Sequence, residues 1–516
     1  MKRVEIVFAA LGLVLLVWGA VWIERGRGPM RDVALDGGPA CPAAPVRILE
    51  PASVPSRGSV VIFHGLGANR IVMLTSGQQF AAAGFRAYLV DSPGHGNNTA
   101  PFSFAANEAC ARGLLDTLEH RGEITPHRTV LFGHSMGAAL VVRLADSFPA
   151  AATIAVSTAP LVPPHRLPSN LLLVAPQWDM PPVLHMEREL SRAAGAERIA
   201  PEDFRQLRAF RLLNVARRSH TSALFDSSAA RIMLRWALDA VGAAGVPEHP
   251  PDYHAFAGGW LGLLGILLIF PATASCTARL LGIPVPAGTG SPPPQMILSC
   301  FAWIAMLVPS AIIAARWPLL AALHLYSADY LVSALFLAGI PLAVGYGVHA
   351  GHRRRSGPSE CSSSHSFSGP ICGAIVGLVT ITAAGAWLNW QLAEAWPIPA
   401  RWARFAFLLV ALFPICLAEE HALGDPRALG WFARQGRSVL FLLLRGIVLL
   451  VLLFAWVSGV SSALLALIFL AFLAVLTLCQ RLGADALRHR TGSVLAAAIF
   501  NAILGAWFLA AAFPLT

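Results

Sequence analysis

The sequence predicts an α/β domain with a mostly parallel sheet, joined to one N-terminal and about eight C-terminal transmembrane helices. Of the 516 residues, 56% are hydrophobic and only 13% are charged. The mean hydropathy of +0.62 is too apolar for a soluble protein of this size. The apolar residues are unevenly spread, because residues 25–246 have an ordinary globular composition and long apolar runs follow from about Phe256. We therefore expect a globular domain at 25–246 and a helical bundle at 247–516.

The N-terminus is the first candidate membrane segment. Lys2 and Arg3 precede an apolar run over residues 4–23, which is long enough to span a bilayer and longer than the core of a signal peptide. No small-residue cleavage pattern follows the run, so residues 1–24 are interpreted as an uncleaved signal anchor. A cleaved signal peptide is the alternative.

The C-terminal half contains about eight further apolar runs of roughly 20 residues each, the length that a membrane-spanning helix needs. A tight helical hairpin is expected around Ser458. The candidate spans are residues 256–275, 295–315, 329–350, 370–390, 403–418, 438–458, 461–479 and 493–513.

The arginines predict which loops face the cytoplasm. The net charge of +10 comes largely from arginines between the apolar runs, so we interpret them as topology determinants and expect no nucleic-acid partner. With a cytoplasmic N-terminus, few arginines fall in the outside loops of the bundle. The inside loops then hold Lys2, Arg3, Arg279, Arg353, Arg354, Arg355, Arg427, Arg434, Arg437, Arg481, Arg488 and Arg490. This bias places the globular domain on the periplasmic or extracellular side of what we expect to be a bacterial cytoplasmic membrane.

Two of the eight cysteines, Cys41 and Cys110, lie in the globular domain. An oxidising compartment would permit them to form a disulfide, but the sequence alone leaves a pair of free thiols equally open. The other six lie in or beside the spans and show no metal-ligand spacing, so we expect no metal or cofactor. Five polar residues lie within or near the apolar runs and are interpreted either as functional or as structural pairs: His324, Asp329, Glu394, Arg445 and Asn501.

The pentapeptide Gly133-His134-Ser135-Met136-Gly137 is the most informative motif. It follows the apolar residues 129–132 and precedes the helix-prone residues 138–142. A G-x-S-x-G sequence between a strand and a helix is typical of a nucleophile elbow, in which a sharp turn exposes the serine hydroxyl and small residues must flank it. Ser135 is therefore the candidate nucleophile.

Short apolar runs alternate with helix-compatible stretches throughout the globular domain. This alternation predicts a parallel sheet that is covered by helices on both faces. The helix-compatible stretches include 76–83 and 108–120. The strand candidates are residues 59–63, 87–90, 129–132, 153–156, 171–174 and 211–215.

Over roughly residues 46–241 the chain resembles the α/β-hydrolase superfamily. Besides the elbow, His64-Gly65-Leu66-Gly67 directly follows the first strand candidate. The resemblance implies that the backbone N–H groups of Leu66 and Met136 form the oxyanion hole. The segment Asp91-Ser92-Pro93-Gly94-His95-Gly96 looks like the D-x-P-G-x-G loop of this superfamily, and we interpret Asp91 and His95 as structural.

The resemblance also implies the remaining members of a catalytic triad. Asp179 follows the strand candidate 171–174 and would be the acid, although this chain has Pro176 where many relatives have glycine. His220 follows the last strand candidate and would be the general base, which gives the order Ser, Asp, His. Weaker alternatives are Asp203 and Asp226 for the acid and His185 and His249 for the base.

The sequence thus predicts a membrane-anchored serine hydrolase that cleaves an ester through an acyl-enzyme. The substrate is expected to be a small molecule or a lipid acyl ester. Two alternatives stay open: a peptidase or thioesterase on the same fold, and a membrane transport or regulatory protein with a non-catalytic hydrolase-like domain.

Overall fold

The computed structural model describes residues 3–51, 55–243, 252–284, 295–317, 319–355, 367–426, 431–460 and 470–516. Two compact units make up the chain. The globular unit comprises Trp18–Leu261 together with two short distant segments, Trp387–Ala395 and Pro514–Thr516. The helical unit comprises Met1–Val17, Gly262–Ala386 and Trp396–Phe513.

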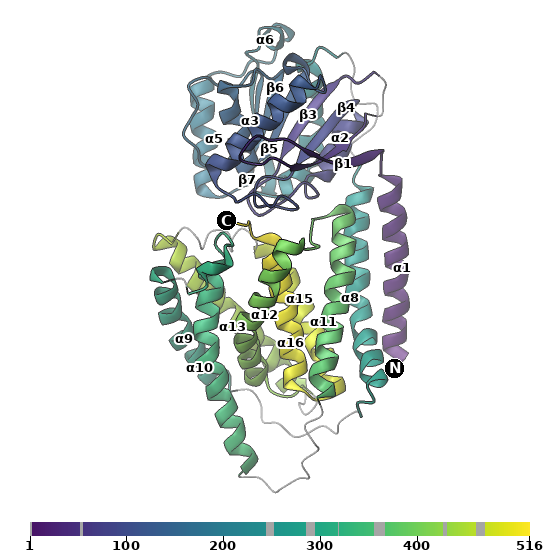
Figure 1. The fold of residues 1–516 in the computed structure, drawn as a ribbon, viewed down its shortest axis with the longest axis vertical. Coiled ribbons are helices and arrows are strands. Elements are labelled where there is room, and N and C mark those ends of the chain that lie inside the picture. The colour runs from purple at the N-terminus through teal and green to yellow at the C-terminus, as the bar shows by residue number, and fades with distance from the viewer. Residues whose placement is uncertain are drawn as a thin grey trace. The chain divides into compact units, whose positions relative to one another are not determined.

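An eight-stranded sheet forms the centre of the globular unit (Figure 1), with the strand order β1-β2-β4-β3-β5-β6-β7-β8. β1 and β2 are antiparallel to their neighbours, and β3 to β8 are parallel. The fold is therefore the mostly parallel α/β sheet that the sequence predicts. The strands are β1 Met30–Leu35, β2 Ala44–Leu49, β3 Gly58–Phe63, β4 Phe85–Val90, β5 Thr129–His134, β6 Ala152–Val156, β7 Leu171–Trp178 and β8 Phe210–Ser219.

Helices cover both faces of this sheet. Alternate side chains along a strand point to opposite faces, so each central strand contributes to two apolar cores. One core packs the sheet against α2 (Leu74–Ala82), α6 (Pro201–Arg205) and α7 (Ser227–Ala240). The other packs it against α3 (Phe104–His120), α4 (Met136–Arg143) and α5 (Pro181–Ala194). The carboxyl ends of the parallel strands then meet at one edge of the sheet, where polar loops can converge.

All six strand candidates lie within observed strands, but the sequence analysis missed β1 and β2. β1 is a half-exposed edge strand that carries Arg31 and Asp32, and β2 contains Pro45 and Arg47. Both strands therefore lack the continuous apolar run that marks β3 to β8. An ion pair between Arg47 Nη2 and Asp32 Oδ2 (2.7 Å) links them instead.

The long helices of the chain agree with the predicted apolar runs. Within the described ranges, eight helices are long and apolar enough to cross a membrane, which is compatible with an integral membrane protein. They are α1 Arg3–Arg25, α8 His254–Leu280, α9 Met296–Arg316, α10 Ala328–Arg355, α11 Ser368–Gln391, α12 Pro399–Leu423, α13 Trp431–Val457 and α16 Val494–Ala512. The predicted span 461–479 lies partly outside the described residues, and α15 (Leu470–Thr491) covers the rest of it.

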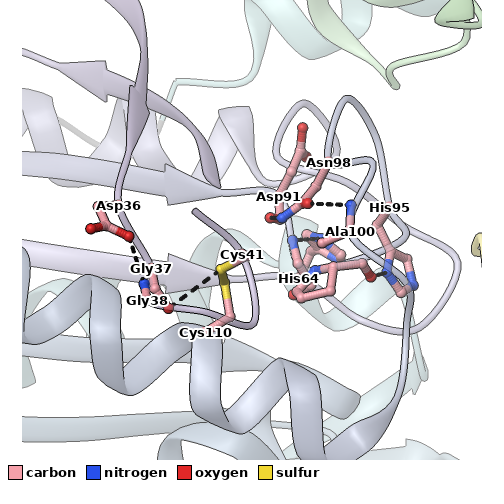
Figure 2. Close-up of a disulfide and its surroundings, with 12 residues drawn as sticks. Asp36, Gly37, Gly38, Cys41, His64, Asp91, His95, Asn98, Ala100 and Cys110 are labelled. Carbon is pink, nitrogen blue, oxygen red and sulfur yellow. Dashed lines mark hydrogen bonds between the residues drawn. A yellow bond between two sulfur atoms is a disulfide. The ribbon is translucent and has the colours of Figure 1, made fainter. Parts of the chain in front are cut away.

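Cys41 and Cys110 form a disulfide (Figure 2), which decides between the two alternatives left open by the sequence. Cys41 lies in the loop between β1 and β2, and Cys110 lies on α3, with 5.5 Å between their Cα atoms. Both cysteines are buried at 1% exposure. The disulfide therefore links the loop at the antiparallel edge of the sheet to α3.

We expect Cys110→Ser to lower the thermal stability of the globular unit. The disulfide closes a loop with a sequence separation of 69 residues, which corresponds to a contribution of up to about 4 kcal/mol in the chain-entropy description. The measurement is the thermal unfolding midpoint of the full chain with and without reductant. Alkylation of both cysteines in the native, unreduced protein would contradict the pairing.

Candidate active site

Ser135 occupies the bend between β5 and α4. Its backbone has φ +56° and ψ −113°, a strained conformation for any residue other than glycine. The flanking glycines are sterically required, because a Cβ on Gly133 would overlap the backbone of Gly137 and one on Gly137 would overlap the backbone of Phe63. The bend therefore presents the Ser135 side chain beyond the carboxyl end of the sheet, in the geometry of a nucleophile elbow.

The structure brings Ser135, His220 and Asp179 together in one hydrogen-bonded row. The Ser135 hydroxyl lies 2.9 Å from Nε2 of His220, and Nδ1 of His220 lies 2.7 Å from Oδ1 of Asp179. Asp179 follows β7 and His220 follows β8, so three strand ends supply the row. Burial opposes ionisation of Asp179. The hydrogen bond and charge of His220, together with hydrogen bonds from Ser157 and the backbone of Met180, outweigh burial and hold the pKa of Asp179 below its ordinary value.

Two residues that the sequence analysis did not assign hold the backbone of His220. Nε2 of His134 lies 2.9 Å from the carbonyl oxygen of His220, and the Ser157 hydroxyl donates to the same oxygen over 3.1 Å. Burial and the neighbouring His220 lower the pKa of His134 to about 3, so its ring is neutral at physiological pH. Because a carbonyl oxygen can only accept, Nε2 of His134 carries the ring proton and donates it.

A buried carboxyl group supports the loop behind the nucleophile. Glu187 on α5 is 1% exposed, and its Oε1 accepts from the backbone N–H of Thr158 over 2.7 Å. The next N–H, that of Ala159, donates to the carbonyl oxygen of Ser135 over 3.3 Å. Burial, reinforced by the charge of Asp179, raises the pKa of Glu187 to about 8. Glu187 is therefore mostly neutral at pH 7.

The loop His64-Gly65-Leu66-Gly67 lies against the nucleophile. A Cβ on Gly65 would be 3.1 Å from Cβ of Ser135, so a side chain there would crowd the serine. Met136 is the first residue of α4, and its N–H therefore has no acceptor within the helix. In the part of the chain that the structure describes, the N–H of Leu66 also donates no hydrogen bond. Both N–H groups are available to a substrate oxygen.

Asp91 and His95 organise the loop after β4, as the sequence analysis interprets them (Figure 2). Asp91 is fully buried and accepts from the backbone N–H groups of Arg70 (2.8 Å) and Asn97 (3.1 Å). Nδ1 of His95 lies 2.8 Å from the carbonyl oxygen of Pro93. His64 accepts from the N–H of Ser92 through Nε2 over 3.1 Å, which links this loop to the one after β3.

The weaker alternatives for acid and base lie elsewhere. Asp226 caps α7 and pairs with Arg218, and Asp203 pairs with Arg208 at 2.9 Å. His185 is an exposed residue paired with Glu189. His249 lies outside the described residues.

The family model described as serine aminopeptidase, S33, matches residues 54–194. The globular unit is an α/β-hydrolase domain of the serine hydrolase type. A comparison of the sequence with curated proteins finds no match.

Several solved structures are similar to this hydrolase domain at low sequence identity. TT1662 from Thermus thermophilus is 19% identical, with 42% of this chain and 100% of that chain covered and a TM-score of 0.31. An alpha-beta serine hydrolase homologue from Coxiella burnetii is 16% identical, with coverages of 40% and 96% and a TM-score of 0.32. The Pyrobaculum calidifontis esterase is 12% identical, with coverages of 47% and 95% and a TM-score of 0.33.

We expect Glu187→Gln to reduce the loss of stability that the wild type shows between about pH 5 and pH 8. The pKa of Glu187 rises from 4.5 to about 8 on folding, so above pH 4.5 the unfolded chain releases a proton that the folded chain retains. The stability of the wild type therefore falls as the pH rises from about 5 to 8, and this fall should be smaller in the variant. The measurement is the unfolding midpoint at pH 5 and pH 8.

The partly exposed Glu189 lies on the same helix, and Glu189→Gln is the matched control. If Glu187→Gln and Glu189→Gln show the same pH dependence as the wild type, Glu187 does not titrate in this range.

Proposed function

We propose that this protein is a membrane-anchored serine hydrolase that cleaves an acyl ester through Ser135, His220 and Asp179. The observation that carries the proposal is the continuous row of hydrogen bonds from Ser135 through His220 to Asp179. Such a row is what a serine needs to become a nucleophile at neutral pH.

The reaction follows from these contacts. Nε2 of His220 accepts the hydroxyl proton of Ser135 while Oγ bonds to the carbonyl carbon of the substrate. The bond from that carbon to the leaving alcohol then breaks, and His220 protonates the departing oxygen. Water repeats the sequence on the acyl-enzyme and regenerates Ser135. Throughout, the carboxylate of Asp179 keeps the proton on Nδ1 and stabilises the imidazolium.

The developing negative oxygen needs donors that are already in place. The backbone N–H groups of Leu66 and Met136 are the proposed donors, since both are uncommitted and the loop that carries Leu66 lies against Ser135. Losing one donor of this kind typically lowers kcat by two to three orders of magnitude, roughly 3 to 4 kcal/mol.

An ester of an uncharged acyl group is the preferred substrate class. Asp179 of the triad and the neighbouring Glu187 are both buried and hydrogen-bonded, so neither carboxyl group is positioned to bind an α-ammonium group. The domain also connects to apolar helices at both ends, α1 and α8, which favours a lipid or lipid-linked ester. The second candidate is aminoacyl amide hydrolysis, and the match to a family described as serine aminopeptidase favours it.

We further propose that the hydrolase domain comprises residues 25–246 and lies outside the cytoplasm. Glu5 near the start of α1 pairs with Arg490 at the end of α15, which supports a common cytoplasmic side for these two ends. Trp387–Ala395 and Pro514–Thr516 belong to the globular unit, so both lie on the side of the hydrolase domain. The N–H of Leu515, for instance, donates to the carbonyl oxygen of Gly94 over 2.9 Å.

This placement requires an even number of membrane crossings between Ala395 and Pro514. The helices α12, α13 and α16 supply three crossings. A fourth crossing is therefore needed between Val457 and Val494, where the sequence predicts the span 461–479. The positive-inside pattern and the contacts of the two segments thus support the same topology.

We expect Ser135→Ala to abolish labelling by a fluorophosphonate probe and to lower acyl-ester hydrolysis by at least about 10³-fold, since the acyl-enzyme cannot form. Purified full-length protein would be assayed with acyl esters, lipids and aminoacyl amides. The exposed Ser227 lies outside the row, and Ser227→Ala should retain labelling and turnover. Labelling that survives Ser135→Ala would contradict the mechanism, and turnover confined to aminoacyl amides would replace the ester by the peptidase alternative.

We expect an alkaline phosphatase reporter to be active when it is fused after Val246 and inactive when it is fused after Arg355. The first position follows the hydrolase domain, and the second is at the end of α10, which the arginine pattern assigns to the cytoplasmic side. The measurement is reporter activity in intact bacteria that express each fusion at equal levels. The opposite pattern would reverse the topology.

A further inference from the structure

The segment after α11 contacts the loop that follows β3. Glu394 lies in this segment, in the part of the chain assigned to the globular unit. Its backbone N–H donates to Oδ1 of Asn69 over 3.0 Å, and its carbonyl oxygen accepts from Nδ2 of Asn69 over 3.4 Å. Its carboxyl Oε1 lies 3.1 Å from Nη2 of Arg70. The side chains of Arg70 and Glu394 are only 5% and 6% exposed, so solvent screens this contact little.

Asn69 and Arg70 directly follow the turn that carries Leu66. The turn is closed by a hydrogen bond from the N–H of Ala68 to the carbonyl oxygen of Gly65, over 3.0 Å. Asn69 Oδ1 also accepts from the N–H of Ile71 over 3.2 Å, so the same side chain organises the entry to α2. A shift of Asn69 or Arg70 is therefore transmitted to the N–H of Leu66 through a few stiff peptide units.

Arg70 is held from two sides. Its guanidinium pairs with the carboxylate of Asp91, and its backbone N–H donates to the same carboxylate over 2.8 Å. Glu394 contacts another nitrogen of the same guanidinium. Asp32 on β1 adds a longer contact from the same side, 3.7 Å from Nε of Arg70. Without Glu394, Arg70 would therefore be held only from the side of the sheet. Glu394 supplies the contact from the segment between α11 and α12.

We propose that Glu394 is a positioning residue for the hydrolase site, and that the segment between α11 and α12 holds, through Asn69 and Arg70, the turn that places the N–H of Leu66. The inference rests on the proposed function, because it assigns a purpose to the position of that N–H. An oxyanion donor works only when it is already placed before the reaction, and a misplacement of about 1 Å can lower the rate by about 10²-fold.

The carboxyl group of Glu394 need not be charged for this role. Burial and the adjacent Asp91 carboxylate raise the pKa of Glu394 to about 9, so the group is mostly neutral at pH 7. A glutamine would retain an oxygen that can accept from Arg70. An alanine would retain neither the oxygen nor the packing. Glu394→Gln and Glu394→Ala therefore separate the contact from the charge.

The experiment compares kcat and KM of the full chain in lipid nanodiscs, with an activated acyl ester as substrate. We expect Glu394→Ala and Asn69→Ala to lower kcat by about 10- to 100-fold with KM changed by less than about twofold, because the oxyanion forms only in the transition state. Glu394→Gln should retain kcat to within about threefold. The second-order rate of fluorophosphonate labelling should fall in parallel with kcat.

Gln391 provides a matched control. Gln391 is the last residue of α11, and its side-chain amide donates to Gln78 on α2 over 3.0 Å. Gln391→Ala therefore breaks a neighbouring contact with the globular unit, away from the turn. We expect this variant to retain kcat. An equal loss of kcat in Gln391→Ala, an effect confined to KM, or an unchanged kcat in Glu394→Ala would overturn the inference.

Two further comparisons keep the test decisive. If Glu394→Ala does not fold, Glu394→Asp replaces it: the shorter side chain withdraws from Arg70, so kcat should fall below that of Glu394→Gln, and equal values would overturn the inference. Failure of the proposed function has a different signature. In that case the wild type itself is not labelled, or Ser135→Ala is labelled as well.

Discussion

The strained bend at Ser135 is the constraint on which the rest of the site depends. A serine with positive φ between β5 and α4 is stable only where the surrounding backbone holds it, and the structure provides that support closely. The N–H of Ser135 donates to the carbonyl oxygen of Val156 over 2.9 Å, and its carbonyl oxygen accepts from Ala159 over 3.3 Å. The end of β6 and the residues that follow it therefore hold both backbone polar groups of the nucleophile. The same segment supplies Ser157, which holds the backbone of His220.

Parallel strands explain why so much of the site could be predicted from the sequence. Ser135, Asp179 and His220 each follow an apolar run, and in a parallel sheet the residues that follow such runs converge at one edge. The elbow motif selected Ser135, and the resemblance to the α/β-hydrolase superfamily then implied Asp179 and His220 from their positions after later strands. The roles of His134 and Ser157 were not predictable, because each depends on a backbone oxygen 86 or 63 residues away. Glu187 resembles any charged helix residue until its burial is known.

Spatial proximity also accounts for the other features that the sequence left open. A disulfide between Cys41 and Cys110 requires their Cα atoms to lie within bonding range, and no local pattern reports that distance. β1 is the edge strand of the sheet and β2 lies next to it, so both can carry charged residues that reach solvent. The apolar pattern that would predict these strands from the sequence is therefore weak, although their antiparallel pairing completes the sheet next to β4.

Three of the five polar residues that the sequence analysis singles out in the apolar runs fall into two groups. Arg445 pairs with Glu419 at 2.7 Å, and the side chain of Asn501 donates to Glu420 over 3.2 Å, both within the helical unit. Such pairs offset the cost of removing polar groups from water, so a structural role within the bundle accounts for these residues. Glu394 differs, because all its contacts described above are with the globular unit. A buried acidic residue is costly to retain unless it is paired, and its partners belong to the turn beside the nucleophile. The distinction between the two groups is thus one of location: the first stabilises the bundle, whereas Glu394 acts on the loops that border the hydrolase site.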